Sequence, residues 1–452
     1  MSRPVEVRRD ASGAHELVVL DNGVLRLTAA PALGGRLLSV RHRGREHLYR
    51  NPRLLGEDLQ PVEGVVLGPV DGPMSAWNNV GGDKTWPAPQ GWDGPDEWAG
   101  PPDSVLDSGP YTAETATAPD GSAVLTLTSG DDPRSGLRLT RRLTLAPDSA
   151  SYRLDLEAVN VSGTARRWAL WNVTQLDGGP GGPGESGGTG ESGGTGGPDE
   201  FGGNDRPDGS GAPGETRVPG EPGVQKEQGG RDGARGVYVG VSGPGPHTVP
   251  LVAGNGRPRV VEHTPSVVRV PLQDVVGKVG FPTASGWLAD VGAGGTLTQR
   301  FAVREGAEYP DGGSRAEVWL ECPVDRPLEH LGGLCPVDRV TEVEALGPLT
   351  ELGPGRSTSL AVEFGFGTGT GPVAEVTPDG FWSEEPRWGA PEPGGRRLSG
   401  VFTSSRAGAL VHRASGRTVA RTRPGEPSRF DALVPEPDTD TAPAVVFAPD
   451  RA

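Results

Sequence analysis

Alternation of apolar and polar residues runs through most of this 452-residue chain, and this period of two constrains the fold more than any other feature. The stretch "YRLDLEA" places four apolar residues on one face of a strand: Tyr152, Leu154, Leu156 and Ala158. The same pattern recurs at 123–129, 136–145, 296–303 and 359–366, with the charged Arg141 at one apolar position of the second stretch. Clusters of Gly, Pro, Asn or Asp separate these stretches every eight to twelve residues, and no convincing helical periodicity occurs. The sequence therefore predicts an all-β sandwich or barrel.

A Gly- and Pro-rich segment, residues 177–236, interrupts this pattern and repeats the hexamer ESGGTG at Glu185 and Glu191. Its only large apolar residues are Phe201, Val218 and Val224. Their burial cannot offset the entropy of ordering about sixty residues, so we expect this segment to be disordered. It could link two domains or be inserted into one. Because strand patterns of the same kind flank it, we favour an insertion, which adds only about 0.6 kcal/mol of loop-closure cost per doubling of loop length.

The expected organisation is one β-sandwich domain over residues 1–372, interrupted by that insertion, and a different region over 373–452. The second region is rich in Pro, Gly and charges and then contains short strand patterns. It is predicted to be either a small β-rich C-terminal extension or a set of strands added to the main sheet.

Charge and composition exclude several classes of partner. The net charge of −16 disfavours nucleic acid and anionic membrane surfaces. The N-terminus lacks the apolar core of a secretory signal and no stretch approaches a membrane span, so we expect a cytoplasmic protein. In that compartment Cys322 and Cys335 are expected to be reduced thiols, and neither a metal site nor a dinucleotide or phosphate-loop motif is found. No cofactor is expected, and no feature assigns an oligomeric state.

Four of the ten tryptophans lie at positions 77, 86, 92 and 98, in a segment of prolines, glycines and charges. An aromatic face can carry the C–H surface of a sugar, and neighbouring amide, carboxylate and ammonium groups can bind its hydroxyls. The segment is therefore predicted to contact a ligand, unless the indoles simply close one end of the sandwich. The candidate binding residues in it are Trp77, Asn78, Asn79, Asp83, Lys84, Trp86, Gln90 and Trp92.

Four segments between Leu20 and Gly367 carry a resemblance to a known family. They are "LDNGVLRLTAAPALGGRLLSVRHRGREHLYRNP", "GGDKTWPAPQ" with "PPDSVLDSGPY", "WALWNVTQL", and "YPDGG" followed by "EVWLE" and "VTEVEALGPLTELGPGRS". In order and spacing they resemble the galactose mutarotase-like superfamily, and within it an uncharacterised bacterial family. The resemblance implies a large antiparallel β-supersandwich.

The resemblance also implies a candidate base. In the superfamily's aldose epimerases a glutamate on a late strand, just before a Pro-Gly turn, removes the proton of the anomeric hydroxyl. The corresponding residues here are Glu344, which we favour, and Glu342. Alternation places both on one face of their strand and Val343 on the other, and paired carboxylates raise each other's pKa. The alternative is an exposed polar strand face.

The expected acid is absent. Epimerases carry a histidine in an aromatic central strand, and in "LWNVTQ" Trp171 stands at that position while Asn172 remains. None of the seven histidines falls in a matching motif. Lys84 or Asp83 could act as the acid instead, and Trp171 and Asn172 are expected to contact the ligand.

These observations predict a carbohydrate-binding, mutarotase-like protein whose partner is a sugar or sugar-like small molecule. The specific hypothesis is an aldose 1-epimerase-type enzyme that opens the sugar ring by general acid/base catalysis. The alternatives are a non-catalytic sugar binder and a protein-interaction β-sandwich, with a hydrolase or lyase less favoured. The hypothesis requires the indoles to line an open concavity opposite the carboxylates.

Overall fold

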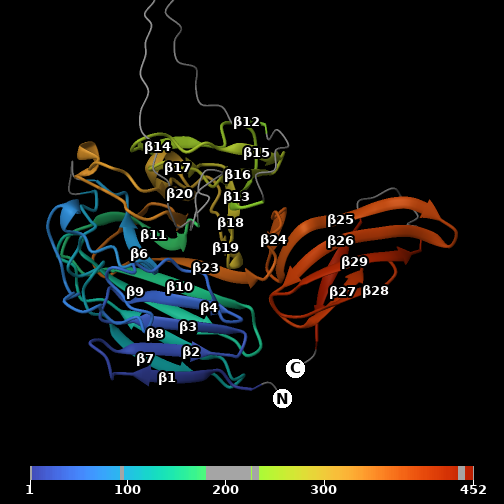
Figure 1. Ribbon diagram of the computed structural model, residues 1–452, viewed down its shortest axis with the longest axis horizontal. Coiled ribbons are helices and arrows are strands. Elements are labelled where there is room, and N and C mark those ends of the chain that lie inside the picture. The colour runs from blue at the N-terminus through green and yellow to red at the C-terminus, as the bar shows by residue number, and fades with distance from the viewer. Residues whose placement is uncertain (1–2, 92–95, 180–224, 227–233, 436–442, 451–452) are drawn as a thin grey trace, which may run out of the picture.

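The computed structural model describes residues 3–91, 96–179, 225–226, 234–435 and 443–450, and strands dominate these ranges (Figure 1). The helical segments in them are single turns: η1 (Met74–Ala76), α1 (Pro310–Gly313) and η2 (Glu329–Leu331). The all-β architecture predicted from the alternation is therefore confirmed.

Two large sheets pack against each other (Figure 1). The first sheet has, in spatial order, the strands β1 (Glu6–Asp10), β2 (Leu17–Asp21), β3 (Leu25–Ala30), β4 (Arg36–His42), β6 (Asp83–Ala88), β11 (Arg166–Asp177), β21 (Val340–Leu346), β20 (Ala316–Glu321), β17 (Gly277–Phe281) and β14 (Val249–Ala253). Two short strands extend it, β5 (Arg45–Glu46) beside β4 and β22 (Thr350–Leu352) beside β11.

The second sheet has, in order, β12 (Gln225–Lys226), β15 (Val261–Thr264), β16 (Val267–Pro271), β13 (Gly236–Val241), β18 (Ala284–Gly292), β19 (Gly295–Phe301), β23 (Ser357–Gly367), β10 (Ser151–Asn160), β9 (Leu137–Leu145), β8 (Ala123–Thr128) and β7 (Thr112–Thr117). Within each of the two sheets, neighbouring described strands pair antiparallel, except that β12 pairs parallel with β15. Antiparallel sheets commonly bury one face and expose the other, which accounts for the period of two in the sequence.

The core lies between the sheets and is built from the predicted alternating residues. In β9 and β10 the buried residues alternate with exposed or half-buried ones along the whole strand. Leu143 and Leu154, opposite each other across the two strands, are completely buried. Each such leucine stabilises the fold by about 1.5–3 kcal/mol relative to an exposed one.

Arg141 is the charged residue among the alternating buried residues of β9, and it is as buried as the leucines beside it. Its guanidinium extends from β9 to the first sheet, where it pairs with the carboxylate of Asp83 on β6 and donates to the Asp83 carbonyl. The other oxygen of Asp83 accepts hydrogen bonds from Asn172 at 2.8 Å and Thr174 at 2.6 Å, both on β11. Gln299 of the second sheet donates to the Thr174 hydroxyl at 2.7 Å. A buried polar network therefore joins the two sheets.

Strands on both sides of the Gly-rich segment belong to the same two sheets. β11 ends at Asp177 in the first sheet, and β13 begins at Gly236 in the second. Most of the segment predicted to be a disordered insertion, residues 180–224 and 227–233, lies outside the described residues.

The strands after residue 373 pair with one another and form two small sheets beside the sandwich (Figure 1). One sheet has β24 (Glu375–Thr377), β25 (Gly380–Glu392), β26 (Gly395–Ser404) and β29 (Pro427–Val434), and the other has β28 (Thr418–Thr422), β27 (Gly408–His412) and β30 (Val445–Pro449). A cluster of buried side chains joins them: Trp382, Leu398, Phe402, Leu410, Phe430 and Val434. The assignment of residues 373–452 as a small β-rich C-terminal extension or as strands added to the main sheet stays a prediction.

We predict that Asp83→Ala destabilises the protein by about 3–5 kcal/mol, because it leaves the buried Arg141 guanidinium without a counter-charge. The matched control is Asp155→Ala, which removes a surface carboxylate paired with Arg153 (side chains 40% and 48% exposed) and should cost less than about 1 kcal/mol. Urea denaturation followed by far-UV circular dichroism measures both. Similar losses for the two variants would contradict the importance given to the buried pair.

Candidate functional site

The face of the first sheet that points away from the second sheet carries an unusual set of charged and aromatic side chains. We call it the outer face. Alternation and register place the following residues of β6, β11, β21, β20 and β17 on it: Lys84, Trp86, Trp171, Gln175, Lys278, Glu317, Trp319, Glu321, Glu342 and Glu344. Val343 points the other way and is fully buried between the sheets, as the alternation predicted.

One part of the outer face is a lysine held between two carboxylates. Lys278 Nζ lies 2.5 Å from Glu317 Oε2 and 2.9 Å from Glu344 Oε2, and the indole N–H of Trp171 donates to the same Glu344 oxygen at 2.6 Å. Burial alone lowers the pKa of Lys278, but the attraction of Glu317 and Glu344 outweighs it and raises the pKa above that of an ordinary lysine. Burial also raises the pKa of Glu317 well above its usual range. Lys278 therefore keeps its positive charge, and its contacts hold Glu317 and Glu344 in place.

A second lysine lies on the same face under different electrostatic conditions. Lys84 Nζ is 3.6 Å from Glu342 Oε1, which also accepts a hydrogen bond from Gln175. Burial lowers the pKa of Lys84, and the nearby Glu342 offsets this effect only in part. Burial raises the pKa of Glu342 to about 7, against the opposing attraction of Lys84. The pair therefore combines an acid and a base whose pKa values are shifted toward neutrality.

Indole rings enclose the two lysines. The ring centroid of Trp86 is 5.2 Å from that of Trp171, 5.1 Å from that of Trp98 and 6.1 Å from that of Trp77. Lys84 Nζ lies over the rings of Trp86 and Trp77, at 4.4 and 4.9 Å from their centroids. Such cation–π contacts stabilise a cation that has lost water.

Two aspartates of the "PPDSVLDSGPY" segment hold this indole wall in place. The N–H of Trp77 donates to Asp107 at 2.9 Å, and that of Trp98 donates to Asp103 at 3.0 Å. Asp107 is itself fixed by a buried ion pair with Arg36 at 2.8 Å. The indoles of Trp77 and Trp98, which lie on either side of "GGDKTWPAPQ" in the sequence, are thus hydrogen-bonded to the "PPDSVLDSGPY" segment.

The expectation of an open concavity is wrong for most of the rings. Trp86, Trp98 and Trp171 are only 1–3% exposed, because they pack on one another and on the loops above the sheet. Trp77 is half-buried and lies at the rim of a cavity of about 330 Å³. We call this cavity the tryptophan pocket; it is lined by Tyr49, Asn51, Arg53, Leu54, Met74, Ser75, Trp77, Asn78, Asn79, Glu321 and residues 333–338.

Six buried polar atoms of the outer face have no hydrogen-bond partner among the described residues. Two are donors, Lys84 Nζ and Trp86 Nε1, and four are acceptors: Gln175 Oε1, Glu344 Oε1 and both carboxylate oxygens of Glu317. More than nine in ten buried polar groups in native proteins are paired, so six such atoms on adjacent strands mark a place where polar ligand groups would be stabilised. A ligand could therefore form hydrogen bonds both with donors and with acceptors of the outer face.

The other predicted site residues have different positions. Asp83 and Asn172 face the interior and belong to the network with Arg141, so they do not reach the outer face. Asp83 therefore cannot supply the missing acid. Gln90 donates to the Gly100 carbonyl and braces the loop, and Trp92 lies outside the described residues.

Lys278 and Glu317 are functional candidates that the sequence reasoning missed. Lys278 is the second residue of the buried strand "GKVGF", and Glu317 alternates in phase with Glu321 in "AEVWLE". Charged residues within strands that are otherwise rich in apolar residues were the signal that could have identified both.

Comparisons with known proteins give similarity in fold. No protein-family model and no curated protein matches the chain. Its structure is similar to a TPR-domain containing protein from Parabacteroides distasonis, with 12% identity and a TM-score of 0.44, over 77% of this chain and 46% of that one. The chain thus spans less than half the length of that protein.

Galactose mutarotase-like proteins are also among the similar structures. The one from Lactobacillus casei has 10% identity and a TM-score of 0.39, over 77% of this chain and 99% of that one. The one from Clostridium acetobutylicum has 9% identity and a TM-score of 0.36, over 80% and 98%. These are proteins of the superfamily that the sequence resembles, and at this identity they carry no activity over to the chain. None of the helices in the described ranges is long and apolar enough to cross a membrane.

We predict that Glu342→Gln changes the pH dependence of stability. The pKa of Glu342 is about 7 in the folded protein and about 4.3 in an unfolded chain, so the stability contributed by the protonated group is lost as pH rises through about 7. The variant should match the wild type near pH 5 and be more stable at pH 8, by on the order of 3 kcal/mol. Urea denaturation at both pH values tests this. Equal differences at both pH values would contradict it, and Glu57→Gln on the exposed surface is the control.

Proposed function

We propose that this chain binds a sugar or sugar derivative on the outer face of the first sheet and acts as an aldose 1-epimerase-type isomerase. The observation that carries the proposal is the set of buried donors and acceptors beside the indole rings that have no hydrogen-bond partner among the described residues. Sugar hydroxyls both donate and accept hydrogen bonds, so they complement Gln175 and Glu344 as acceptors and Lys84 and Trp86 as donors. The indole faces suit the C–H surface of the same ligand.

The reaction requires one base and one acid near the anomeric carbon. The base removes the proton of the anomeric hydroxyl while the acid protonates the ring oxygen, and the bond between the anomeric carbon and that oxygen breaks to give the open-chain aldehyde. Rotation of the aldehyde and the reverse proton transfers close the ring as the other anomer. No proton or electron is gained or lost overall, so no cofactor is required.

Glu342 and Lys84 fit these two roles better than Glu344 and Lys278. A catalytic acid or base works best when its pKa is near the working pH. Glu342 has a pKa of about 7 and Lys84 a lowered one, whereas Lys278 has a raised pKa and is a poor proton donor. The separation of 3.6 Å between Lys84 and Glu342 lets the pair reach two oxygens bonded to one carbon. Glu344, the glutamate favoured from the sequence, is assigned to holding the ligand.

We predict that Glu342→Gln and Lys84→Met each slow anomer interconversion by about 10²–10⁴-fold, which is the usual contribution of general acid/base catalysis. Polarimetry of freshly dissolved glucose and galactose measures the rate. The wild-type rate should rise as pH increases through about 7, when Glu342 loses its proton, and fall once Lys84 loses its own. Glu114→Gln, on an exposed strand, is the control. A wild-type chain that does not accelerate interconversion of any aldose tested would refute the enzymatic part of the proposal.

A non-catalytic sugar binder is the second candidate, and Trp171 favours it. This indole stands where an epimerase histidine is expected, and its N–H is committed to Glu344. A binder of this kind would hold sugar equally well after Glu342→Gln.

We predict that Trp77→Ala weakens sugar binding at least tenfold, because Trp77 lies at the rim of the tryptophan pocket and covers Lys84. Calorimetric titration with the aldose that most raises the melting temperature measures this change. Trp388→Ala removes a half-buried indole from the C-terminal sheets and serves as the control. If both variants bind the sugar equally well, the Trp77 indole is not part of the proposed site.

A further inference from the structure

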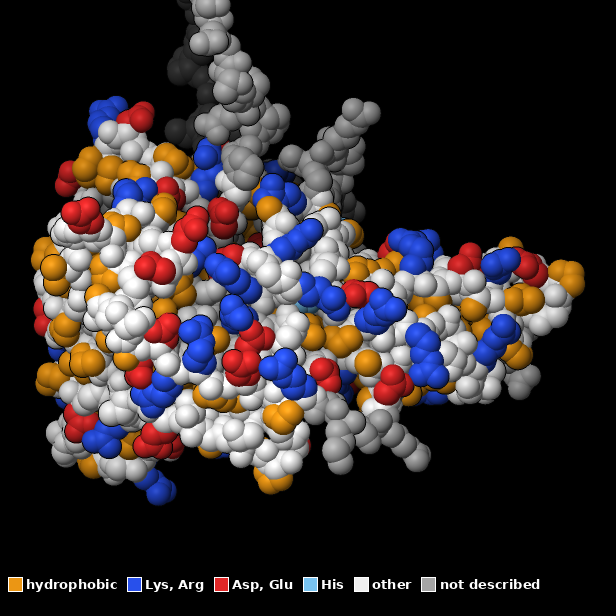
Figure 2. All heavy atoms as spheres, turned by 60° about the horizontal axis from the view of Figure 1, so that its bottom comes forward, with side chains coloured by type: hydrophobic (Ala, Val, Ile, Leu, Met, Phe, Trp, Pro, Cys, Tyr) orange, Lys and Arg blue, Asp and Glu red, His pale blue; other side chains and the backbone are white. Residues whose placement is uncertain are grey.

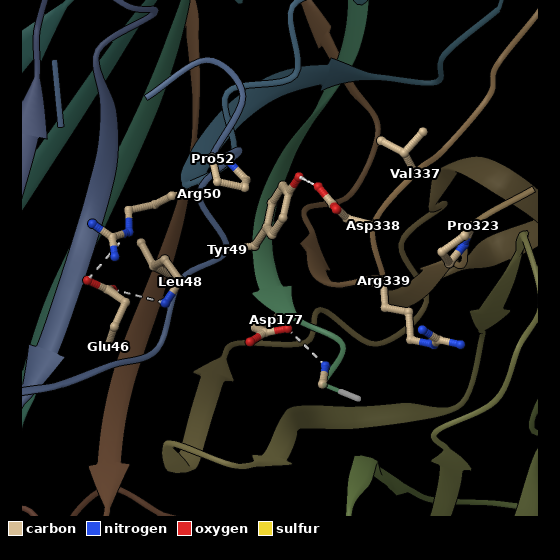
Figure 3. Close-up of a pocket in the computed structure, with 11 residues that line it drawn as sticks. Glu46, Leu48, Tyr49, Arg50, Pro52, Asp177, Pro323, Val337, Asp338 and Arg339 are labelled. Atoms are coloured by element: carbon tan, nitrogen blue, oxygen red, sulfur yellow. Dashed lines mark hydrogen bonds and ion pairs between the residues drawn. The ribbon is translucent and has the colours of Figure 1, made fainter. Parts of the chain in front are cut away.

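A second cavity of about 470 Å³ adjoins the tryptophan pocket, and none of the predicted site residues lines it. We call it the arginine pocket. Figure 3 shows Glu46, Arg50 and Leu48 on one side, Val337, Asp338 and Arg339 on the other, and Asp177 between them. The remaining lining residues are Tyr49, Pro52, Gly179 and Pro323.

Each arginine in or beside the arginine pocket is paired with a carboxylate. Arg50 lies 4.0 Å from Glu46, and Arg339 lies 3.0 Å from Asp274 just outside the pocket. Arg53 pairs with Asp338 at 2.6 Å. Because each guanidinium already has a carboxylate, the pocket offers little net attraction for a phosphate, and the further carboxylate of Asp177 accepts a hydrogen bond from the Gly179 N–H. The pocket offers alternating donors and acceptors instead, which suit a neutral ligand with many hydroxyl groups.

The two pockets share three lining residues. Tyr49, Val337 and Asp338 line both cavities, and the Tyr49 hydroxyl donates to Asp338 at 2.6 Å (Figure 3). The Tyr49 ring is 8% exposed and is therefore held firmly at the junction. A ligand that extends past this ring would be in contact with both cavities.

We propose that the arginine pocket is a second sugar subsite and that the ligand of this chain is a neutral oligosaccharide. This inference rests on the proposed function. The reducing-end residue lies in the tryptophan pocket, against the Trp77 ring that Lys84 Nζ covers, and the following residues cross Tyr49 into the arginine pocket. The separate cavities, about 330 and 470 Å³, each fall within the range of ordinary ligand sites.

Calorimetric titration with glucose, maltose, maltotriose, cellobiose and cellotriose tests the inference. In at least one series the affinity should rise tenfold or more from one residue to three. Arg50→Ala and Arg339→Ala should each remove most of that gain while the affinity for glucose is retained. Arg142→Ala, on the exposed face of the second sheet, is the control, and circular dichroism verifies the fold of each variant.

The outcomes separate the two proposals. Glucose binding with no gain for longer chains, or a gain that survives both arginine variants, overturns the second subsite and leaves the proposed function intact. Absence of binding for every sugar overturns the proposed function together with this inference.

Discussion

The ion pair between Arg141 and Asp83 fixes the register of β6, and that register decides which side chains form the candidate site. Neighbouring residues of a strand point to opposite faces, so a shift by one residue would exchange all of them. With Asp83 bound to the second sheet, Lys84 and Trp86 must point outward. The same network holds Asn172 and Thr174 of β11 inward and thereby directs Trp171 to the outer face. The buried polar network therefore also determines which side chains form the candidate site.

The outer face carries more carboxyl groups than ammonium groups, and this imbalance explains its pKa pattern. Glu317, Glu321 and Glu342 all have raised pKa values because they are buried, while Lys278 is shared between two carboxylates. A buried charge that lacks a full counter-charge changes its protonation at modest energetic cost. Such groups are suited to exchanging protons with a ligand.

Much of the fold followed from the sequence because alternation is a local property. The alternating apolar residues in 136–145 and 151–160 predicted the core face of two strands. Alternation also placed Glu342 and Glu344 together on one face. The candidate site was harder to predict, because it depends on which strands become neighbours. Asp83 and Lys84 are adjacent in sequence and were both taken as ligand contacts, although they face opposite ways.

Other parts of the site could not be predicted because their residues are far apart in the sequence. Lys278 meets Glu344 only through the pairing of β17, β20 and β21, which no single segment reveals. The burial of Trp86 and Trp171 also arises from packing between distant segments, and a cluster of indoles in the sequence does not distinguish a sealed wall from an open platform.

The close packing of Trp77, Trp86, Trp98 and Trp171 has an optical consequence. Indole emission responds to charges and solvent near the ring, and here lysine ammonium groups lie directly over three of these rings. Any ligand that moves Trp77 or screens Lys84 would alter the light that the protein emits. The tryptophans of the outer face are therefore an intrinsic fluorescent reporter of ligand binding at the candidate site.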